Sequence, residues 1–324
     1  MAAAGLAALA AILPLPLAAQ SWTASHQFPV GDPRDQALRR LADDLAGLGI
    51  AIRIFPQATL LSPRDQLSGL NNGTLDLALI PADYMIDRIP QIAVLSLPGV
   101  VRGLDHARRL NASGPMRDLH RRIEAAGAVV IGQSWAAGTI AGRRHCIVAP
   151  TDAAGLRARI IGPYYAELWG ATGAVPVPVP TSEMLATLLD HGLIDIASTS
   201  VTTLLSARLR TRFACLTLPG AAGAIWYFYE PILLSRRAWE ELDTERRQAV
   251  LDAGSRAGSA LTANASRFER QLAGDYLAAG IEVRTLDPEA LTAWQRLARR
   301  TSWKMFREQV AGGAEMIDRV LAVE

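Results

Sequence analysis

The sequence alternates twice between segments with strand periodicity and segments with helix periodicity, and this alternation leaves few possible architectures. In the first half, strand patterns such as Ile50–Pro56 and Ala128–Trp135 are separated by helix patterns such as Asp35–Leu48. The alternation then restarts, with further strand patterns at Leu156–Ile161 and Leu193–Ser200. Strands that alternate with helices indicate a parallel or mixed sheet in an α/β domain. Two such runs in 324 residues predict two α/β units.

A long helix pattern near the C-terminus follows the two runs. Apolar residues keep helical spacing from Asp243 to Ala279, and Gly280 ends the pattern. At 1.5 Å per residue, such a helix would be roughly 50 Å long, which exceeds the width of a small domain. We therefore expect one continuous helix that packs on both units.

Composition and the N-terminal segment restrict the class of protein. Half of the residues are hydrophobic, a fifth are charged and the net charge is +2, which suits a globular protein and is too small to indicate nucleic-acid binding. The first 20 residues have a small-residue apolar core, interrupted by Pro14 and Pro16, and a small-residue exit at Ala18-Ala19. They are too short and too broken for a transmembrane helix. We predict a signal peptide over residues 1–20 and an extracytoplasmic mature chain.

Signatures of cofactor and metal sites are absent from the sequence. There is no CxxC, no HExxH, no EF-hand loop, no P-loop and no GxGxxG between a strand and a helix. We therefore expect no cofactor, no metal and no enzyme. The one catalytic candidate is Ser134 in GQSWA, which is close to the Gly-x-Ser-x-Gly elbow of serine hydrolases but ends in Ala136. A secreted hydrolase built on Ser134 is the minor alternative.

Two arginines interrupt the apolar segment GLRARIIGP. Arg157 and Arg159 would share one face of a strand. We expect Arg157 to be exposed on an edge strand. Arg159 lies beside the turn at Gly162-Pro163, and we expect it to point into the crevice where α/β sheets bind ligands. Its guanidinium offers a planar pair of donors that matches a carboxylate.

Two other features of this half of the chain concern its framework. The segment AVPVPVP has proline at every second position, Pro176, Pro178 and Pro180, which suits an edge strand because proline has no backbone donor. The two cysteines, Cys146 and Cys215, can form a disulfide in an oxidising compartment. Two buried free thiols fit the sequence equally well.

The order of several short motifs resembles the solute-binding proteins of TRAP transporters, of the DctP type. Residues 152–159 are similar to the family's D-x-x-G-L-K-x-R, residues 173–177 to G-A-x-P-V, and residues 192–195 to G-x-V-D. ASHQFP, LSGLNNGTLDLALIP and ILLSRRAWEEL extend the likeness over nearly the whole mature chain. The resemblance implies a two-lobed α/β periplasmic binding protein (type II-like). It would have mixed sheets flanked by helices, hinge strands and a long helix straddling both lobes.

The same resemblance implies a function, partners and lobe boundaries. The protein would capture a small organic acid in the periplasm by hinge closure and deliver it to the small and large membrane subunits of a TRAP permease. A sensing module that feeds a receptor remains an open alternative. The lobes would comprise residues 21–138 plus 216–255 and residues 139–215 plus 256–324. We expect a monomer that binds no nucleic acid.

The site implied by the resemblance departs from the family pattern at two places. Arg159 falls at the family's carboxylate-binding arginine, but Thr139 stands nearest to the position of a second arginine that many members carry. Arg143 or Arg144 could replace it. Ser198, Thr199 and Ser200 stand where many members carry an asparagine. A site with less positive charge and more hydroxyl groups than is usual in the family favours a monocarboxylate, or a ligand with hydroxyl groups, over a dicarboxylate.

The expected ligand contacts come from both lobes and from the hinge. Core packing is the alternative for each aromatic residue among them. The residues expected to contact the ligand are Arg159, Thr139, Ser182, Ser198 and Thr199 in the second lobe, Ser25, Tyr84 and Trp226 in the first lobe and hinge, and Trp135, which would stack on an apolar part of the ligand.

Overall fold

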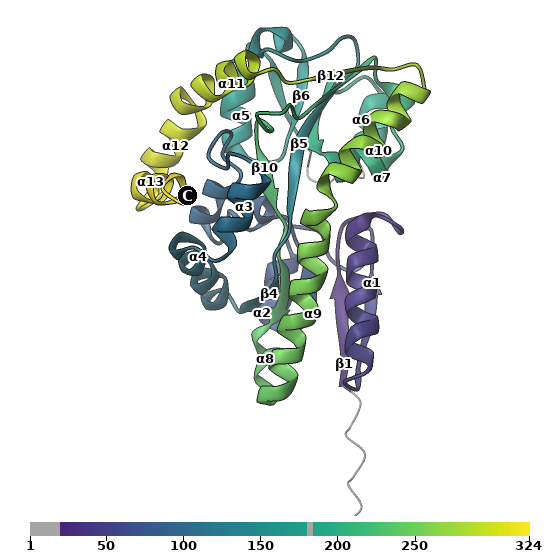
Figure 1. The fold of residues 1–324 in the computed structure, drawn as a ribbon, viewed down its shortest axis with the longest axis vertical. Helices are drawn as coiled ribbons and strands as arrows, with labels where there is room; N and C mark the ends of the chain where they lie inside the picture. Colours follow the sequence, from purple (N-terminus) through teal and green to yellow (C-terminus); the bar gives the residue numbers. More distant parts are fainter. Residues whose placement is uncertain (1–19, 180–183) are drawn as a thin grey trace, which may run out of the picture.

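The computed structural model describes residues 20–179 and 184–324 and contains two mixed sheets flanked by helices (Figure 1). Within these residues the first sheet has five strands in the order β2-β1-β3-β11-β4. β1, β2 and β3 run parallel, and β11 is antiparallel to both of its neighbours. The strands are β1 (Gln20–Ser25), β2 (Ile50–Phe55), β3 (Leu77–Leu79), β4 (Ala128–Gly132) and β11 (Ile232–Ser235).

The second sheet has the order β12-β9-β5-β8-β6-β7, and β10 pairs with β5. The pairs β6-β7, β6-β8 and β9-β12 are parallel, whereas β5 is antiparallel to its three partners. The strands are β5 (Trp135–Gly142), β6 (Arg157–Ile160), β7 (Val175–Pro178), β8 (Ile196–Ser200), β9 (Cys215–Leu218), β10 (Tyr227–Tyr229) and β12 (Glu282–Thr285). These two sheets confirm the predicted two-lobed α/β fold.

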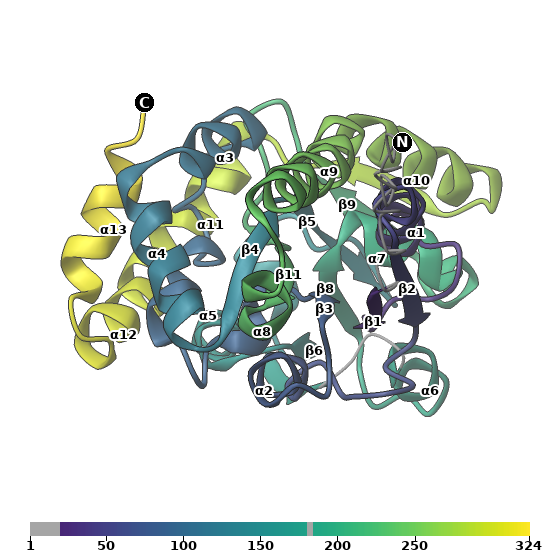
Figure 2. The same ribbon diagram turned by 90° about the horizontal axis from the view of Figure 1, so that it is seen from below.

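Helices cover the faces of both sheets (Figure 2). The helices before β9 are α1 (Pro33–Ala46), α2 (Gln66–Asn72), α3 (Leu104–Asn111), α4 (Gly114–Ala125), α5 (Pro163–Gly170), α6 (Met184–Asp190) and α7 (Val201–Ala207), with short 3₁₀ helices at Ala82–Met85, Pro90–Leu95, Pro150–Ala153 and Arg210–Arg212. The helices after β11 are α8 (Arg236–Glu240), α9 (Thr244–Ala263), α10 (Ala265–Ala278), α11 (Pro288–Arg300), α12 (Ser302–Gln309) and α13 (Gly313–Leu321).

The long helix predicted over residues 243–279 is interrupted, which corrects the sequence-based expectation. Asp243 caps α9 by accepting from the backbone N–H of Arg246, and the break falls at Asn264. The Asn264 side chain donates to the carbonyl of Ala260 at 2.7 Å. α9 packs on α1 and β4, and α10 packs on α7 and β12, so the interrupted helix still straddles both sheets (Figure 1).

Glycines allow α9 to lie directly on the segment that passes from the first sheet to the second. A Cβ placed at Gly254 would lie 2.3 Å from the carbonyl oxygen of Ile131, and one at Gly258 would lie 2.5 Å from that of Gln133. The strand predicted over Ala128–Trp135 therefore ends at Gly132, and β5 begins at Trp135 in the other sheet. This crossing holds the two lobes and the helix together.

The strand with the two arginines is interior, and the strand with the prolines is the edge. β6 pairs with β8 on one side and with β7 on the other, so the expectation of an exposed edge strand for Arg157 is wrong. Pro176 and Pro178 lie in β7 at the end of the sheet, as predicted. Pro180 lies outside the described residues.

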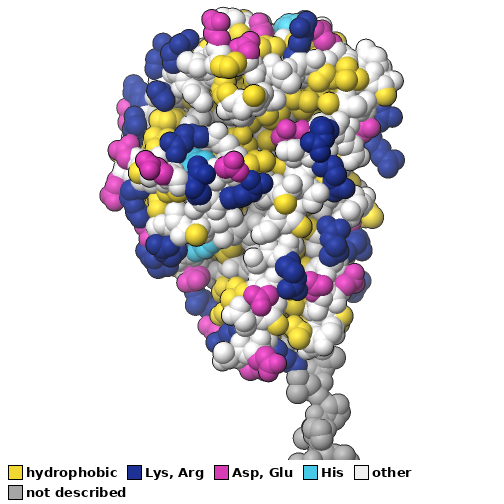
Figure 3. Space-filling model, viewed as in Figure 1, with side chains coloured by type: hydrophobic (Ala, Val, Ile, Leu, Met, Phe, Trp, Pro, Cys, Tyr) yellow, Lys and Arg dark blue, Asp and Glu magenta, His cyan; other side chains and the backbone are white. Residues whose placement is uncertain are grey.

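The hydrophobic core and the surface agree with a globular composition. One buried cluster lies between the first sheet and α1 and α9, and a larger cluster fills the rest of the molecule. Acidic and basic side chains are interspersed on the face shown in Figure 3. In the part of the chain that the structure describes, no helix has the length and apolar character required to cross a membrane.

Candidate functional site

A small pocket lies where the ends of strands from both sheets meet. The residues that line it are Gln27, Arg34, Pro81, Tyr84, Arg159, Ile161, Thr199, Ser200, Thr203, Phe228 and Glu230.

Arg159 brings a buried positive charge to this pocket from the end of β6. Its side chain is 3% exposed. Nη1 donates to the carbonyl of Ser198 at 3.0 Å, and the hydroxyl of Ser198 donates back to the carbonyl of Arg159 at 2.5 Å. Nε has no hydrogen-bond partner among the described residues. Burial lowers the pKa of Arg159, and the neighbouring Tyr84 and Asp83 oppose this effect.

A second arginine lines the same pocket, and sequence reasoning missed it. Arg34 lies in the first turn of α1 and is 1% exposed. It donates to both carboxylate oxygens of Asp32 at 2.8 Å, and its Nη1 lies 2.8 Å from Oε1 of Glu230. Its guanidinium also stacks on Phe28, 3.6 Å from the ring centroid. Although burial opposes them, Asp32 and Glu230 raise the pKa of Arg34 above its usual range.

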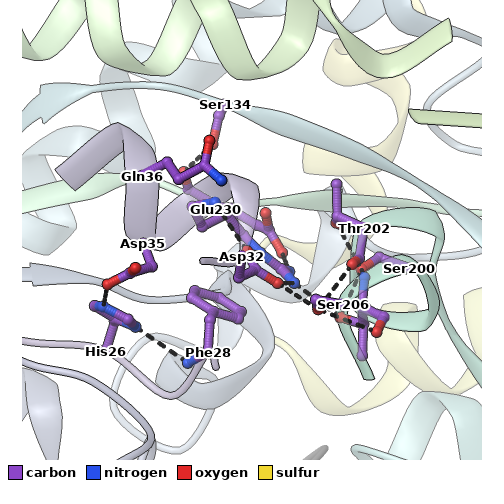
Figure 4. A network of polar contacts seen from close by, with 12 residues as sticks. His26, Phe28, Asp32, Asp35, Gln36, Ser134, Ser200, Thr202, Ser206 and Glu230 are labelled. Carbon is purple, nitrogen blue, oxygen red and sulfur yellow. Dashed lines mark hydrogen bonds and ion pairs between the residues drawn. The ribbon is translucent and has the colours of Figure 1, made fainter. Parts of the chain in front are cut away.

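Hydrogen bonds from this arginine cluster reach across the cleft to α7 (Figure 4). Arg34 Nη2 lies 3.2 Å from Thr203 Oγ1, and the Ser206 hydroxyl donates to Asp32 Oδ2 at 2.6 Å. α1 packs on the first sheet, whereas α7 contacts β5 and β8 in the second. These bonds therefore join the two lobes beside the pocket.

A buried carboxyl group, that of Asp83, lies behind the pocket. Neither of its oxygens has a hydrogen-bond partner in the described ranges. Burial raises the pKa of Asp83 to about 6, with Arg159 opposing and Glu230 adding to the shift. Asp83 is therefore a titratable neighbour of the arginine that we expect to hold the ligand.

The structure brings several of the predicted site residues together. Arg159, Tyr84 and Thr199 line the pocket. Ser198 supports Arg159 through the paired bonds above but does not line the pocket. Ser182 lies outside the described residues.

Two predicted polar residues, Ser25 and Thr139, lie away from the pocket. Ser25 is fully buried in β1, within 3.5 Å of the Gln66 amide. Thr139 faces Thr199 in register, but its hydroxyl donates to the Thr217 carbonyl at 2.8 Å. Neither residue lines the pocket that contains Arg159.

The two tryptophans pack into the core, as the alternative interpretation allowed. Trp226 packs edge-to-face on Tyr165 and lies beside Trp169. Trp135 donates from Nε1 to Asn111 at 2.8 Å and borders a separate cavity that shares Arg34 and Glu230 with the pocket. Neither tryptophan lines the pocket that contains Arg159.

The replacements considered for the family's second arginine also lie elsewhere. Arg143 and Arg144 are exposed, and Arg144 Nη2 lies 3.4 Å from Asp195. The missed residue Glu230 had a signal in the sequence, because it is a single charge inside the apolar run AIWYFYEPILLS. Arg34 had no such signal in the sequence, because an arginine between Asp32 and Asp35 is typical of the exposed first turn of a helix.

The Ser134 side chain lies in a buried position. Its hydroxyl donates to the carbonyl of Glu230 at 2.6 Å. All five histidines lie in the described ranges, and none of them hydrogen-bonds to Ser134.

Cys146 and Cys215 form a disulfide, which joins the segment after β5 to the start of β9. In the described ranges, the single cluster of potential metal ligands consists of these cysteines and Glu282. Because both sulfur atoms are in the disulfide, they are unavailable as thiolate ligands.

Comparison with known proteins identifies the family. A model of bacterial extracellular solute-binding proteins, family 7 (DctP), matches residues 24–309. A solute-binding protein of Albidiferax ferrireducens is 30% identical over 301 residues, covering 90% of this chain and 88% of that protein. The 2,3-diketo-L-gulonate-binding periplasmic protein YiaO of Escherichia coli is 25% identical over 328 residues, covering 98% and 97%.

A solved structure agrees with these relatives. The TRAP periplasmic solute-binding protein from Rhodoferax ferrireducens with bound malonate has a TM-score of 0.87 at 29% identity, covering 92% of this chain and 96% of that chain. The chain therefore belongs to family 7 of the bacterial extracellular solute-binding proteins, the DctP family of TRAP solute-binding proteins.

Proposed function

We propose that this protein captures a small organic acid between its two lobes, with Arg159 binding the carboxylate. The observation that carries the proposal is the buried Arg159 guanidinium, which lines the pocket, donates to a backbone carbonyl and leaves Nε without a hydrogen-bond partner among the described residues. A buried cation without an ionic partner is costly, and a carboxylate supplies both the opposite charge and two acceptor atoms. The relatives that bind malonate and 2,3-diketo-L-gulonate support an acid as the ligand.

The ligand is identified first by a thermal-shift screen of carboxylic acids. An acid present at 100 times its dissociation constant stabilises the protein by about 2.7 kcal/mol. Calorimetry with the best acid then compares wild type with Arg159→Ala. Removing one partner of a buried ion pair costs about 3–5 kcal/mol, which is about two to four decades of affinity.

The control is Arg143→Ala, which removes an exposed arginine outside the pocket. We expect it to bind like wild type. Equal affinity of Arg159→Ala and wild type, with the fold intact by circular dichroism, contradicts the proposal. Loss of binding in Arg143→Ala alone would assign the carboxylate to the other candidate arginine.

The family supports a periplasmic location and membrane partners. We propose secretion through a signal peptide over residues 1–20, of which 1–19 lie outside the described residues. The loaded monomer would then deliver its acid to the small and large membrane subunits of a TRAP permease. Neighbouring genes for these subunits separate transport from sensing by a receptor.

The lobes would close by rotation about the strands and helix that cross between the sheets. We propose lobes of residues 21–138 plus 216–255 and 139–215 plus 256–324. The bonds of Thr203 and Ser206 to the Arg34 cluster support a closed state, as does the bond of 3.2 Å from Arg64 to the carbonyl of Ile161. Small-angle scattering with and without ligand measures the closure.

The function proposed is binding without catalysis. The family consists of solute-binding proteins, and the buried, backbone-bonded Ser134 gives no support to the hydrolase alternative. An unchanged ligand affinity in Ser134→Ala, together with no labelling by a serine-directed phosphonate, would agree with binding alone.

A further inference from the structure

A buried carboxylate, Glu230, lines the pocket together with Arg159. It lies between β10 and β11 and is 4% exposed. Its backbone is fixed by Ser134, whose carbonyl accepts from Glu230 N–H at 2.8 Å and whose hydroxyl donates to the Glu230 carbonyl. Arg34 holds the side chain of Glu230 in turn, so this carboxylate is pre-organised to recognise a ligand group.

One oxygen of Glu230 is available for a ligand. Oε1 accepts from Arg34 Nη1 at 2.8 Å. No hydrogen bond from residues 20–179 or 184–324 reaches Oε2. Because Glu230 lines the pocket, this carboxylate oxygen can accept a hydrogen bond from a donor on a bound molecule.

Arg34 does not cancel the negative charge of Glu230. Its guanidinium is already bonded to both oxygens of Asp32. The group of Asp32, Arg34 and Glu230 therefore carries a net charge of about −1 when ionised. Burial raises the pKa of Glu230, and Arg34 opposes this shift.

The total charge around the pocket limits the charge of the ligand. Arg159 adds one positive charge, and Asp83 adds a negative charge when it is ionised. The charged side chains around the pocket therefore have no net positive charge before the ligand binds. A second carboxylate on the ligand would bring like charges together in a buried space, which is unfavourable.

We propose that Glu230 determines specificity by accepting a hydrogen bond from the ligand whose carboxylate is held by Arg159. The favoured ligands are monocarboxylates with a hydroxyl, amide N–H or ammonium group that reaches Oε2. Dicarboxylates and acids without a donor bind more weakly. This inference rests on the proposed capture of a carboxylate by Arg159.

The test compares matched acids by calorimetry on the wild-type protein. Butyrate, 2-hydroxybutyrate and 2-aminobutyrate differ in one group, as do 3-oxocyclopentanecarboxylate and pyroglutamate, and malonate is the dicarboxylate. A hydrogen bond to a charged group changes affinity by roughly tenfold or more. We expect the donor-bearing member of at least one pair to bind about tenfold more tightly than its analogue and than malonate.

The variant Glu230→Gln keeps the shape of the side chain and an oxygen for Arg34. It replaces the charged acceptor by a neutral amide, which can also donate to a second carboxylate. We expect the advantage of the donor-bearing acid to shrink by about tenfold and malonate to bind about tenfold more tightly. The affinity of the acid without a donor reports on the intact Arg159 contact and should change little.

The outcomes separate the two proposals. If no acid binds the wild type, the proposed function fails and the specificity inference fails with it. If acids bind through Arg159 but matched pairs bind equally, or malonate binds most tightly to the wild type, the role of Glu230 alone is wrong. If Glu230→Gln does not fold, the wild-type series still decides between these results.

Discussion

Arg157 and Asp195 form a two-point ion pair beside the strand that carries Arg159. Arg157 Nε donates to Asp195 Oδ2 at 2.8 Å and Nη2 donates to Oδ1 at 3.1 Å. The backbone N–H of Arg157 donates to the same carboxylate. Arg157 therefore joins β6 to the start of β8 and supports the strand that positions Arg159.

This pair predicts that Arg157→Ala lowers the melting temperature and leaves ligand affinity unchanged. The hydrogen bond from Arg157, opposed by burial, holds the pKa of Asp195 below its usual value. The pair therefore stabilises the fold above the unfolded carboxyl pKa of about 3.9 and loses this effect as the pH falls further. A double-mutant cycle with Asp195→Asn at neutral pH measures the coupling. No coupling between the two substitutions would show that the pair does not support the fold.

Asp83 predicts a stability that depends on pH. Burial raises its folded-state pKa to about 6, so the protonated acid is favoured in the folded state. Stability therefore falls as the pH rises from about 4 to about 6, and at about 1.4 kcal/mol per pKa unit the total loss is about 3 kcal/mol.

The variant Asp83→Asn has no carboxyl group at this position, so it should not lose stability in this way as the pH rises. Urea unfolding should show the variant to be more stable than wild type at pH 8 by up to about 3 kcal/mol, with a much smaller difference at pH 4. A difference that is the same at both pH values would contradict the raised pKa of Asp83.

Two helical glycines predict opposite effects of alanine. A Cβ at Gly254 would lie 2.3 Å from the backbone oxygen of Ile131, whereas at Gly274 no atom lies within 4 Å. Overpacking costs about 1–3 kcal/mol, while alanine in an open helix gains about 0.5–1 kcal/mol over glycine. Gly254→Ala should therefore unfold at lower denaturant concentration than wild type and Gly274→Ala at higher. If both variants are stabilised, α9 does not pack tightly on the crossing segment.

The disulfide predicts a large effect of reduction on stability. Cys146 and Cys215 are 69 residues apart, and closing such a loop in the unfolded chain contributes about 4 kcal/mol in the chain-entropy model. The double variant to serine should melt at a lower temperature and bind the same acid. A thiol assay on the denatured, unreduced protein should find no reactive thiol, and two thiols would contradict the bridge.

Local sequence patterns predicted much of the framework. The helix Asp35–Leu48 and the strand Ile50–Pro56 correspond to α1 and β2 within two residues. These elements have clear hydrophobic periodicity, a proline near the helix start and glycine near its end, so neighbours in the sequence determine them. The break at Asn264 carried no such signal, because helix formers continue on both sides.

The alternating α/β framework, the proline-rich edge strand and the position of Arg159 near the end of a strand follow from local sequence patterns. The set of charged residues that share the pocket follows from the tertiary packing. Glu230 and Arg34 are 196 residues apart, and Asp32 meets Ser206 across 174 residues. Such pairings depend on how the two lobes pack, which local periodicity does not encode. For the same reason Arg157, which has the same strand setting as Arg159, became a structural ion pair with Asp195.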